Sequence, residues 1–308
     1  MEKDSKIYVA GHKGLVGSAI VRKLNSLGFH NILTATSDEL DLVNQQQTLE
    51  FCQSHKPDYA FIAAAKVGGI YANDRYPADF IYSNLMIESN LIHSLYKTGV
   101  RKALFLGSTC IYPRLAEQPL KEESLLSGPL EKTNEWYAVA KIAGIKLCQA
   151  YRLQHNADFI SAMPTNLYGE GDNFDLENSH VLPALIRKFH EAKENNAKAV
   201  MLWGSGKPRR EFCHVDDCAD ACLFLMQGYS DNEIINIGVG EDLAIAELAL
   251  IIKKVVGYSG SIEYDSSKPD GTPRKLVDVS KINGLGWQAK ITLIDGVERT
   301  YQWFLDNQ

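Results

Sequence analysis

The chain has 308 residues, a formal net charge of −6 at pH 7, and 45% hydrophobic against 23% charged residues. This length fits one large or two moderate domains, and the composition is ordinary for a globular protein with a sizeable core. The slightly acidic balance, with no run rich in lysine and arginine, argues against a general nucleic-acid binder.

The N-terminus gives no sign of a targeting or membrane segment. Charged residues come first, followed by a short apolar run that Gly11 interrupts. No apolar stretch approaches the roughly 18 residues that a membrane span needs. We therefore expect a cytoplasmic protein that makes no membrane contact and whose thiols stay reduced.

In the first half of the chain, strand-like and helix-like patterns alternate. We expect strands at residues 6–10, 31–36, 58–65, 102–106 and 158–163. We expect helices at residues 15–27, 48–55, 79–97 and 136–151. Regular alternation of this kind predicts a parallel sheet with helices on both faces.

The pattern loosens after Pro164, where clusters of glycine, proline and polar residues separate expected helices at 181–195 and 245–256. The predicted fold class is therefore α/β, with a doubly wound parallel sheet in residues 1–165. Residues 166–308 are expected to form mainly a smaller α+β substrate lobe. The two parts should interleave, with part of residues 212–243 returning to the first domain.

Six cysteines are present, and no two of them have C-x-x-C spacing. Cys213, His214, Cys218 and Cys222 lie close together in the sequence, so a metal site has to be weighed. Zinc ligands usually come in more tightly spaced pairs. Because free cysteines most often serve as small core residues, we expect no metal.

The first expected strand runs into a glycine loop and then a helix. The loop has G-x-x-G-x-x-G spacing and consists of Gly11, His12, Lys13, Gly14, Leu15, Val16 and Gly17. Glycines at such a turn let the backbone approach a pyrophosphate, and the helix N-terminus favours its negative charge. In this strand–loop–helix context the motif predicts a Rossmann-type dinucleotide site.

The same region bears on cofactor choice. NAD sites commonly place an acidic residue at the end of the second strand, but residues 34–37 (TATS) contain none before Asp38. Lys13 is placed to meet a 2′-phosphate, which favours NADP. A lysine cannot bind two phosphate oxygens as an arginine can, and residues 35–37 add no second cation; both points weaken the preference for NADP. Asp41 is placed to contact the adenine end. Two alternatives stay open: Lys13 as a solvated lysine and Asp41 as a turn cap.

A catalytic constellation follows from Tyr137 and Lys141, whose Y-x-x-x-K spacing puts both on one helix face. A nearby ammonium lowers a phenol pKa, so the tyrosine can exchange a proton with a carbonyl oxygen as hydride moves. Ser108 follows the fourth strand, where its hydroxyl can bond the same oxygen. Cys110 lies two residues further, where an extended segment would aim both side chains the same way.

Several longer motifs extend over nearly the whole chain. They are residues 63–70 (AAAKVGGI), 107–113 (GSTCIYP), 164–169 (PTNLYG), 172–174 (DNF), 178–181 (NSHV), 210–212 (REF), 214–217 (HVDD) and 268–275 (KPDGTPRK). Together with the glycine loop, these motifs closely resemble the GDP-L-fucose synthases, a family of extended short-chain dehydrogenases. The resemblance implies 3,5-epimerisation of GDP-4-keto-6-deoxy-D-mannose, followed by NADPH-dependent reduction at C4.

The resemblance also implies site residues. It assigns Cys110 as the base and His180 as the acid of epimerisation, beside Ser108, Tyr137 and Lys141. It implies substrate contacts at Lys188, Trp203, Arg210 and Asp270, and a homodimer that pairs helices 79–97 and 136–151. The NADP(H) contacts would be residues 11–17, Asp41, Leu106, Gly107, Ser108, Thr109, Lys141, Pro164, Thr165, Asn166, Leu167 and His180.

Other functions compete with this one. A 4,6-dehydratase would need carboxylates just beyond the serine, and residues 109–111 (TCI) supply none. An epimerase/reductase for a related GDP-keto-sugar, such as the 3,6-dideoxy precursor of colitose, is compatible with every motif. A non-catalytic dinucleotide-binding protein could keep the glycine loop, but it would have no need of Tyr137 and Lys141.

Overall fold

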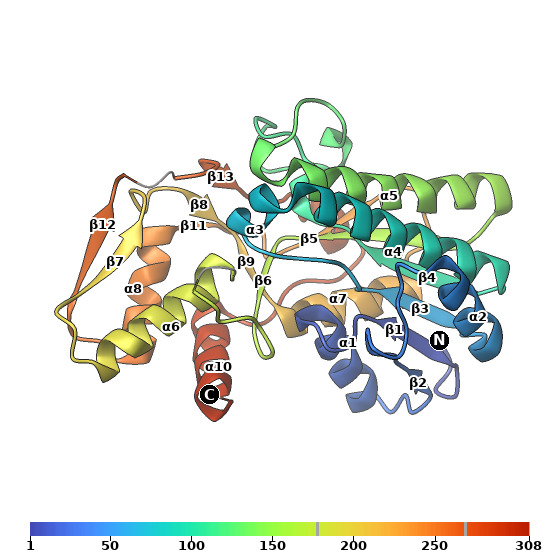
Figure 1. The fold of residues 1–308 in the computed structure, drawn as a ribbon, viewed down its shortest axis with the longest axis horizontal. Helices are drawn as coiled ribbons and strands as arrows, with labels where there is room; N and C mark the ends of the chain where they lie inside the picture. The colour runs from blue at the N-terminus through green and yellow to red at the C-terminus, as the bar shows by residue number, and fades with distance from the viewer. Residues whose placement is uncertain (177–178, 268–269, 308) are drawn as a thin grey trace.

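The computed structural model describes residues 1–176, 179–267 and 270–307, which form a larger and a smaller lobe (Figure 1). A six-stranded sheet forms the centre of the larger lobe, with the order β10-β5-β4-β3-β1-β2 and parallel pairing throughout. Its strands are β1 (Ile7–Ala10), β2 (Ile32–Leu33), β3 (Tyr59–Ile62), β4 (Lys102–Leu106), β5 (Phe159–Pro164) and β10 (Ile235–Ile237).

The order of the sheet reverses at β1. The chain passes from β1 to β2 on one side and then returns to β3 on the other side of β1. In open α/β sheets, such a reversal opens a crevice at the carboxyl ends of the strands, where ligands bind. This topology confirms the doubly wound parallel sheet that the sequence predicts.

Helices cover both faces of this sheet (Figure 1). One face carries α2 (Gln45–His55), α4 (Pro77–Lys97) and α5 (Glu135–His155), and the other carries α1 (Leu15–Ser26) and α7 (Val215–Gly228). Successive side chains of a strand point to opposite faces. Ile7 and Val9 therefore pack with α1 and α7, whereas Tyr8 and Ala10 pack on the side of α4 and α5.

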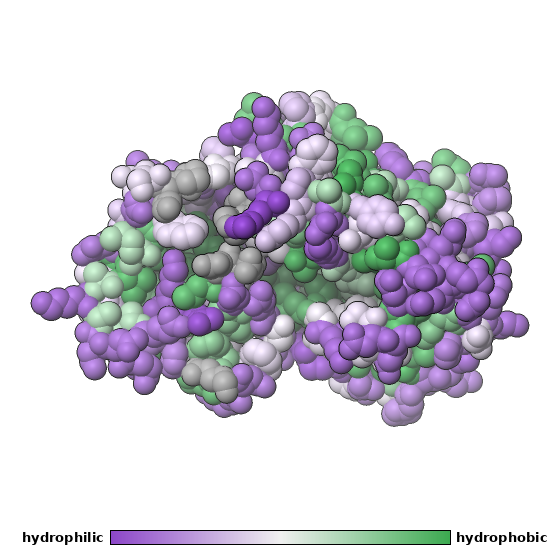
Figure 2. Space-filling model, in the orientation of Figure 1, coloured by the Kyte–Doolittle hydropathy of each residue, from purple (hydrophilic) through white to green (hydrophobic). Residues whose placement is uncertain are grey.

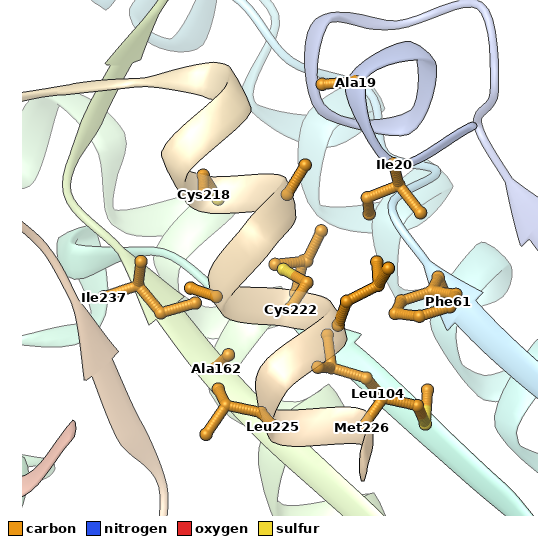
Figure 3. Packing of buried hydrophobic residues seen from close by; sticks show 14 of the residues in the cluster. Ala19, Ile20, Phe61, Leu104, Ala162, Cys218, Cys222, Leu225, Met226 and Ile237 are labelled. Atoms are coloured by element: carbon orange, nitrogen blue, oxygen red, sulfur yellow. The ribbon is translucent and has the colours of Figure 1, made fainter. Parts of the chain in front are cut away.

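The cysteines of α7 belong to this core. Cys218 and Cys222 lie among Leu104, Leu225 and Met226, with further apolar side chains of the sheet and of α1 around them (Figure 3). All six cysteines are buried and free. Within the part of the chain that the structure describes, no group of three or more His, Cys, Asp or Glu residues could hold a metal ion.

The smaller lobe is built from short sheets and helices around a core of its own. Two of its sheets have two strands each: β6 (Asn166–Tyr168) pairs with β9 (Phe212–His214), and β7 (Ala199–Trp203) pairs with β12 (Ser261–Asp265). In a third sheet, β8 (Arg209–Arg210) lies between β11 (Leu243–Ala244) and β13 (Arg274–Lys275). Its helices are α6 (Val181–Glu194), α8 (Ile245–Val256) and α10 (Leu293–Asp306). Between β9 and β11 the chain crosses to the larger lobe and forms α7 and β10.

Short elements complete the fold: α3 (Ile70–Arg75), α9 (Ser280–Gly284), and the 3-10 turns η1 (Thr109–Ile111), η2 (Glu122–Ser124) and η3 (Lys132–Asn134). No helix within the described ranges is both long and apolar enough to cross a bilayer.

The structure corrects several expected boundaries. The strand expected at 31–36 is only Ile32–Leu33, an edge strand that pairs with β1 alone. Helix α2 begins at Gln45 rather than at 48, because the Asn44 side chain accepts a hydrogen bond from the Gln47 N–H. Helix α5 runs on to His155 and ends where Asn156 adopts a left-handed conformation.

We predict that Leu104→Ala lowers the free energy of unfolding by about 2–5 kcal/mol, because it leaves a cavity in the centre of the sheet. Leu104 is 0% exposed on β4. Leu250→Ala removes the same atoms from a side chain of α8 that is 59% exposed, and it should leave the free energy nearly unchanged. Urea unfolding of both variants checks this, and equal losses would contradict it.

Candidate functional site

The predicted cofactor residues lie at the carboxyl edge of the parallel sheet. Residues 11–17 follow β1, residues 106–109 include the end of β4 and the turn after it, and residues 164–167 join the end of β5 to β6. Loops from strands far apart in the sequence therefore meet at one edge. Figure 2 shows a hollow between the two lobes, with hydrophobic residues in it.

The glycine loop fits a dinucleotide phosphate. A Cβ on Gly17 would lie 2.1 Å from the Gly11 carbonyl oxygen, and Gly11 itself has a φ of +83°. The first turn of α1 has no side-chain cap, so its N–H groups can bind an anion. The His12 Nδ1 atom is buried and has no partner among the described residues. The loop thus offers backbone donors that a bound anion can satisfy.

The segment just beyond β2, where the adenine end of a dinucleotide is expected, contains an acidic residue that sequence reasoning overlooked. The Glu39 carboxylate accepts a hydrogen bond from the Thr36 N–H at 2.8 Å, just beyond β2. This hydrogen bond lowers the pKa of Glu39, and the charges of Lys13 and His12 lower it further. The position of Glu39 just after the second strand, where NAD sites commonly have an acidic residue, could have identified it from the sequence. Asp41 is exposed and accepts from the Val43 N–H at 2.9 Å, so it caps a turn.

Ser108 ends the segment that leaves β4. Its Oγ accepts a hydrogen bond from the Cys110 N–H at 3.4 Å and caps η1. The chain here is therefore a 3-10 turn, and the expectation of an extended segment is wrong. Cys110 is 6% exposed. Burial raises the pKa of its thiol, against the opposing effects of Lys275, Ser108 and Lys141.

Tyr137 and Lys141 lie on α5, with the Lys141 Nζ atom 5.7 Å from the centroid of the Tyr137 ring. We expected the lysine to lower the pKa of the phenol, but in this structure that pKa is raised well above its ordinary value. Burial is the main cause, and the charges of Cys110 and Glu88 add to it. Glu88 also pairs directly with the Lys141 ammonium at 2.9 Å.

His180 directly precedes α6, where its side chain makes no capping hydrogen bond, and it lies partly open to solvent. Its pKa is lowered, first by desolvation against the surrounding protein and then by the positive charge of Lys275. The raised pKa of Cys110 and the lowered pKa of His180 favour a thiol and a neutral imidazole. These are the reverse of the protonation states needed for a Cys110 base and a His180 acid.

Lys275 is the second functional candidate that sequence reasoning missed. It lies beside Cys110 and His180, whose pKa values it influences, and it has no ion-pair partner among the described residues. It pairs in register with Arg210 across β13 and β8, so the two cations share a face. The position of Lys275 at the end of motif 268–275 could have identified it from the sequence.

Of the residues in the sequence motifs, Asn178, Lys268 and Pro269 lie outside the described residues.

The expected substrate residues divide into two groups. Lys188 and Trp203 line a cavity of about 680 Å³ between α6 and β7, with the lysine Nζ 5.1 Å from the tryptophan ring. Arg210 donates to the Arg209 carbonyl at 2.8 Å and has no carboxylate partner among the described residues. Asp270, in contrast, accepts hydrogen bonds from the Ser205 N–H at 2.6 Å and hydroxyl at 2.8 Å, and thus holds the loop before β8.

This geometry agrees with the comparisons to known proteins. Residues 7–238 match the family described as "NAD dependent epimerase/dehydratase family". The chain belongs to this family. The match covers the whole parallel sheet and the site at its carboxyl edge.

Two curated relatives span almost the whole chain. GDP-L-fucose synthase 1 of Arabidopsis thaliana is 60% identical, with 99% of this chain and 95% of the relative covered. GDP-L-colitose synthase of Yersinia pseudotuberculosis is more distant at 39% identity, with 98% and 99% covered. The resemblance to the GDP-L-fucose synthases that the motifs indicate is thereby confirmed.

Two solved structures have the same fold. A GDP-6-OMe-4-keto-L-xylo-heptose reductase from C. jejuni is 42% identical, with a TM-score of 0.96 and coverage of 100% of this chain and 99% of the other. A GDP-L-fucose synthetase from Naegleria fowleri bound to NADP is 30% identical, with a TM-score of 0.91 and coverage of 100% and 96%.

We predict that Lys275→Met raises the pKa of both Cys110 and His180. Removing the cation destabilises the thiolate, and it also removes the repulsion that disfavours the imidazolium. The pH dependence of Cys110 alkylation and a histidine NMR titration measure the two groups. Lys281→Met is the control, since Lys281 pairs with Glu233 at 2.6 Å and does not contribute to either pKa. A fall in either value would contradict the prediction.

Proposed function

We propose that the protein converts GDP-4-keto-6-deoxy-D-mannose to GDP-L-fucose, by 3,5-epimerisation and then NADPH-dependent reduction at C4. The observation that carries this proposal is the proximity of two proton-transfer sets, one on the larger lobe and one shared between the two lobes. Tyr137, with Ser108 and Lys141, serves the reduction. Cys110 and His180, with Lys275 beside both, serve the epimerisations, which a simple reductase does not need.

The epimerisations use the acidity that the C4 ketone confers on the protons at C3 and C5. At each carbon the Cys110 thiolate removes a proton from one face, and the electron pair of the broken C–H bond moves to the C4 oxygen as an enolate. Protonated His180 then returns a proton to the opposite face. The active pair arises when a proton passes from the Cys110 thiol to His180, and the Lys275 charge stabilises the thiolate.

The reduction uses the other set of residues. When bound, the reduced nicotinamide supplies the hydride that adds to C4. Tyr137 gives its hydroxyl proton to the C4 oxygen, and Ser108 donates a hydrogen bond to the same atom. The Lys141 ammonium stabilises the tyrosinate that remains, and solvent returns its proton.

The cations of the smaller lobe suit the GDP part of the substrate. Arg210 can bind two diphosphate oxygens through its planar fork, and Trp203 offers an exposed ring for stacking. Lys188 lies over that ring. In this proposal Asp270 acts by shaping the adjoining loop as well as by contacting substrate.

For the cofactor, we propose NADP(H), held by residues 11–17, 106–109 and 164–167, with Asp41, Lys141 and His180. Residues 1–165 would then form the cofactor domain, and residues 166–308, apart from part of 212–243, the substrate lobe. Lys13 would meet the 2′-phosphate and offset the nearby carboxylate of Glu39.

We also propose a homodimer. The exposed faces of α4 and α5 carry large apolar side chains, among them Tyr82, Trp136 and Leu153, which are 59%, 44% and 77% exposed. Pairing these helices with those of a second copy would cover them. Sedimentation of the wild-type protein and of Tyr82→Asp tests this proposal.

In the deciding assay, the purified protein, NADPH and GDP-4-keto-6-deoxy-D-mannose should yield GDP-L-fucose, identified by NMR. Tyr137→Phe should lower NADPH oxidation at least about a hundredfold, because the acid of the reduction is lost. Cys110→Ser should mainly slow deuterium uptake at C3 and C5. If the wild type oxidises NADPH only with the 3,6-dideoxy keto-sugar, the colitose-type reaction is correct instead. NADPH binding without turnover of either sugar would indicate a non-catalytic binder.

We predict that Lys13→Met narrows the preference for NADPH over NADH by about tenfold, the effect of losing about 1.4 kcal/mol of ionic hydrogen bonding. Dissociation constants for both cofactors, from the fluorescence of the reduced nicotinamide, measure the preference. Lys146→Met removes an exposed charge of α5 and serves as the control. An unchanged ratio in Lys13→Met would assign the 2′-phosphate to other residues.

A further inference from the structure

Lys141 is paired with a carboxylate that has no role in the mechanism above. The Glu88 Oε1 atom on α4 lies 2.9 Å from the Lys141 Nζ atom on α5, and the two side chains are 1% and 3% exposed. The ion pair of Lys102 with Asp158, at the amino ends of β4 and β5, is more open: its side chains are 9% and 31% exposed. Both partners of the Glu88 pair are thus almost completely removed from water.

The fold makes room for this pair. A Cβ on Gly144 would lie 2.8 Å from the Glu88 Oε2 atom and 2.5 Å from the Phe105 ring, so only a glycine on α5 admits the carboxylate. The Phe105 ring supports the ammonium from β4, with its centroid 4.7 Å from the Lys141 Nζ atom. Helices α4 and α5 run side by side across this point (Figure 1).

A stabilising role explains the pair poorly. Burial raises the pKa of Glu88, although the attraction of Lys141 acts to lower it. The surroundings of Glu88 therefore disfavour its charged form. Both carboxylate oxygens are buried and neither makes a hydrogen bond among the described residues, so Lys141 meets Glu88 as an ion pair alone. Buried ion pairs of this kind add little stability compared with apolar residues of similar size. What the carboxylate does provide is a fixed place for a cation at the end of a flexible four-carbon chain.

The charge of Glu88 also affects neighbouring groups. Glu88 raises the pKa of Tyr137, although less than burial and Cys110 do. It acts in the same direction on Cys148, one helical turn beyond Gly144 on α5. A phenol that keeps its proton is the state that a general acid for carbonyl reduction requires. The charge of Glu88 therefore favours the acid form of Tyr137, while the Lys141 ammonium lies where it can stabilise the tyrosinate that forms once the proton has left.

We propose that Glu88 is a positioning residue for the reduction, which holds the Lys141 ammonium between the Phe105 ring and Tyr137. The assignment rests on the proposed reduction at C4. The proposal gives Glu88 no part in the epimerisations, which use Cys110 and His180. Loss of the carboxylate should therefore separate the two halves of the reaction.

The test compares Glu88→Gln and Glu88→Asp with Asp158→Asn. The last variant makes the same carboxylate-to-amide change in a cluster with Lys102 and Arg152, away from the site. Three quantities are measured for each: the NADPH dissociation constant without sugar, kcat for reduction, and deuterium uptake at C3 and C5 with oxidised cofactor. In Glu88→Gln we expect reduction to fall at least about tenfold, deuterium uptake to stay within about twofold, and the dissociation constant to rise severalfold.

Glu88→Asp keeps the charge, and the flexible lysine can follow it, so reduction should recover to within about threefold of the wild type. Asp158→Asn should move none of the three quantities. A parallel loss of reduction and deuterium uptake in Glu88→Gln would mean a general structural role. Unimpaired reduction in Glu88→Gln, or no recovery in Glu88→Asp, would also overturn the proposal.

The proposed function can fail separately from the proposal about Glu88. If the wild type neither reduces the keto-sugar nor exchanges its protons, the substrate assignment is wrong. The NADPH dissociation constant needs no sugar and still decides the role of Glu88. A severalfold rise in Glu88→Gln supports the positioning of Lys141, whereas an unchanged constant overturns it.

Discussion

The parallel pairing of β1, β3, β4 and β5 brings the carboxyl ends of these strands to one edge of the sheet. The glycine loop, the Ser108 turn and the segment after β5 all start from this edge. Because each strand is held by backbone hydrogen bonds on both sides, these loops begin from fixed points. The smaller lobe then supplies His180, Arg210 and Lys275, so the proposed reaction depends on both lobes.

Charge is distributed unevenly in this site. Arg210 and Lys275 share a face and have no ion-pair partner among the described residues, which leaves both free for an anionic substrate. Lys141 is instead neutralised by Glu88 in nearly complete burial. The two arrangements suit two tasks. Free cations attract a diphosphate and stabilise an enolate, whereas a paired cation holds a defined position without raising the net charge around Tyr137.

Motif and periodicity predicted much of the larger lobe. Strand β4 and helix α8 have the predicted limits, and the glycine loop lies between β1 and α1 as its spacing indicates. Prediction failed where long-range contacts override local pattern. No limits were predicted for helix α7, because its polar and cysteine-rich sequence is buried only through packing on α1 and the sheet. The predicted direction of the Tyr137 pKa shift was wrong, because the Y-x-x-x-K spacing contains no information about the burial of Tyr137 or about the charges of Cys110 and Glu88.

The sequence by itself determined the family, and it predicted the dinucleotide loop and the Ser108–Tyr137–Lys141 set. These depend on residues close in the chain, or on motifs whose spacing is set by one strand or one helix turn. Only the tertiary structure decided which charges meet. Glu88 reaches Lys141 because Gly144 leaves space between α4 and α5, and Lys275 reaches Cys110 because β13 pairs with β8. Electrostatic effects depend on distance and burial, and for residues far apart in the chain both are set by packing.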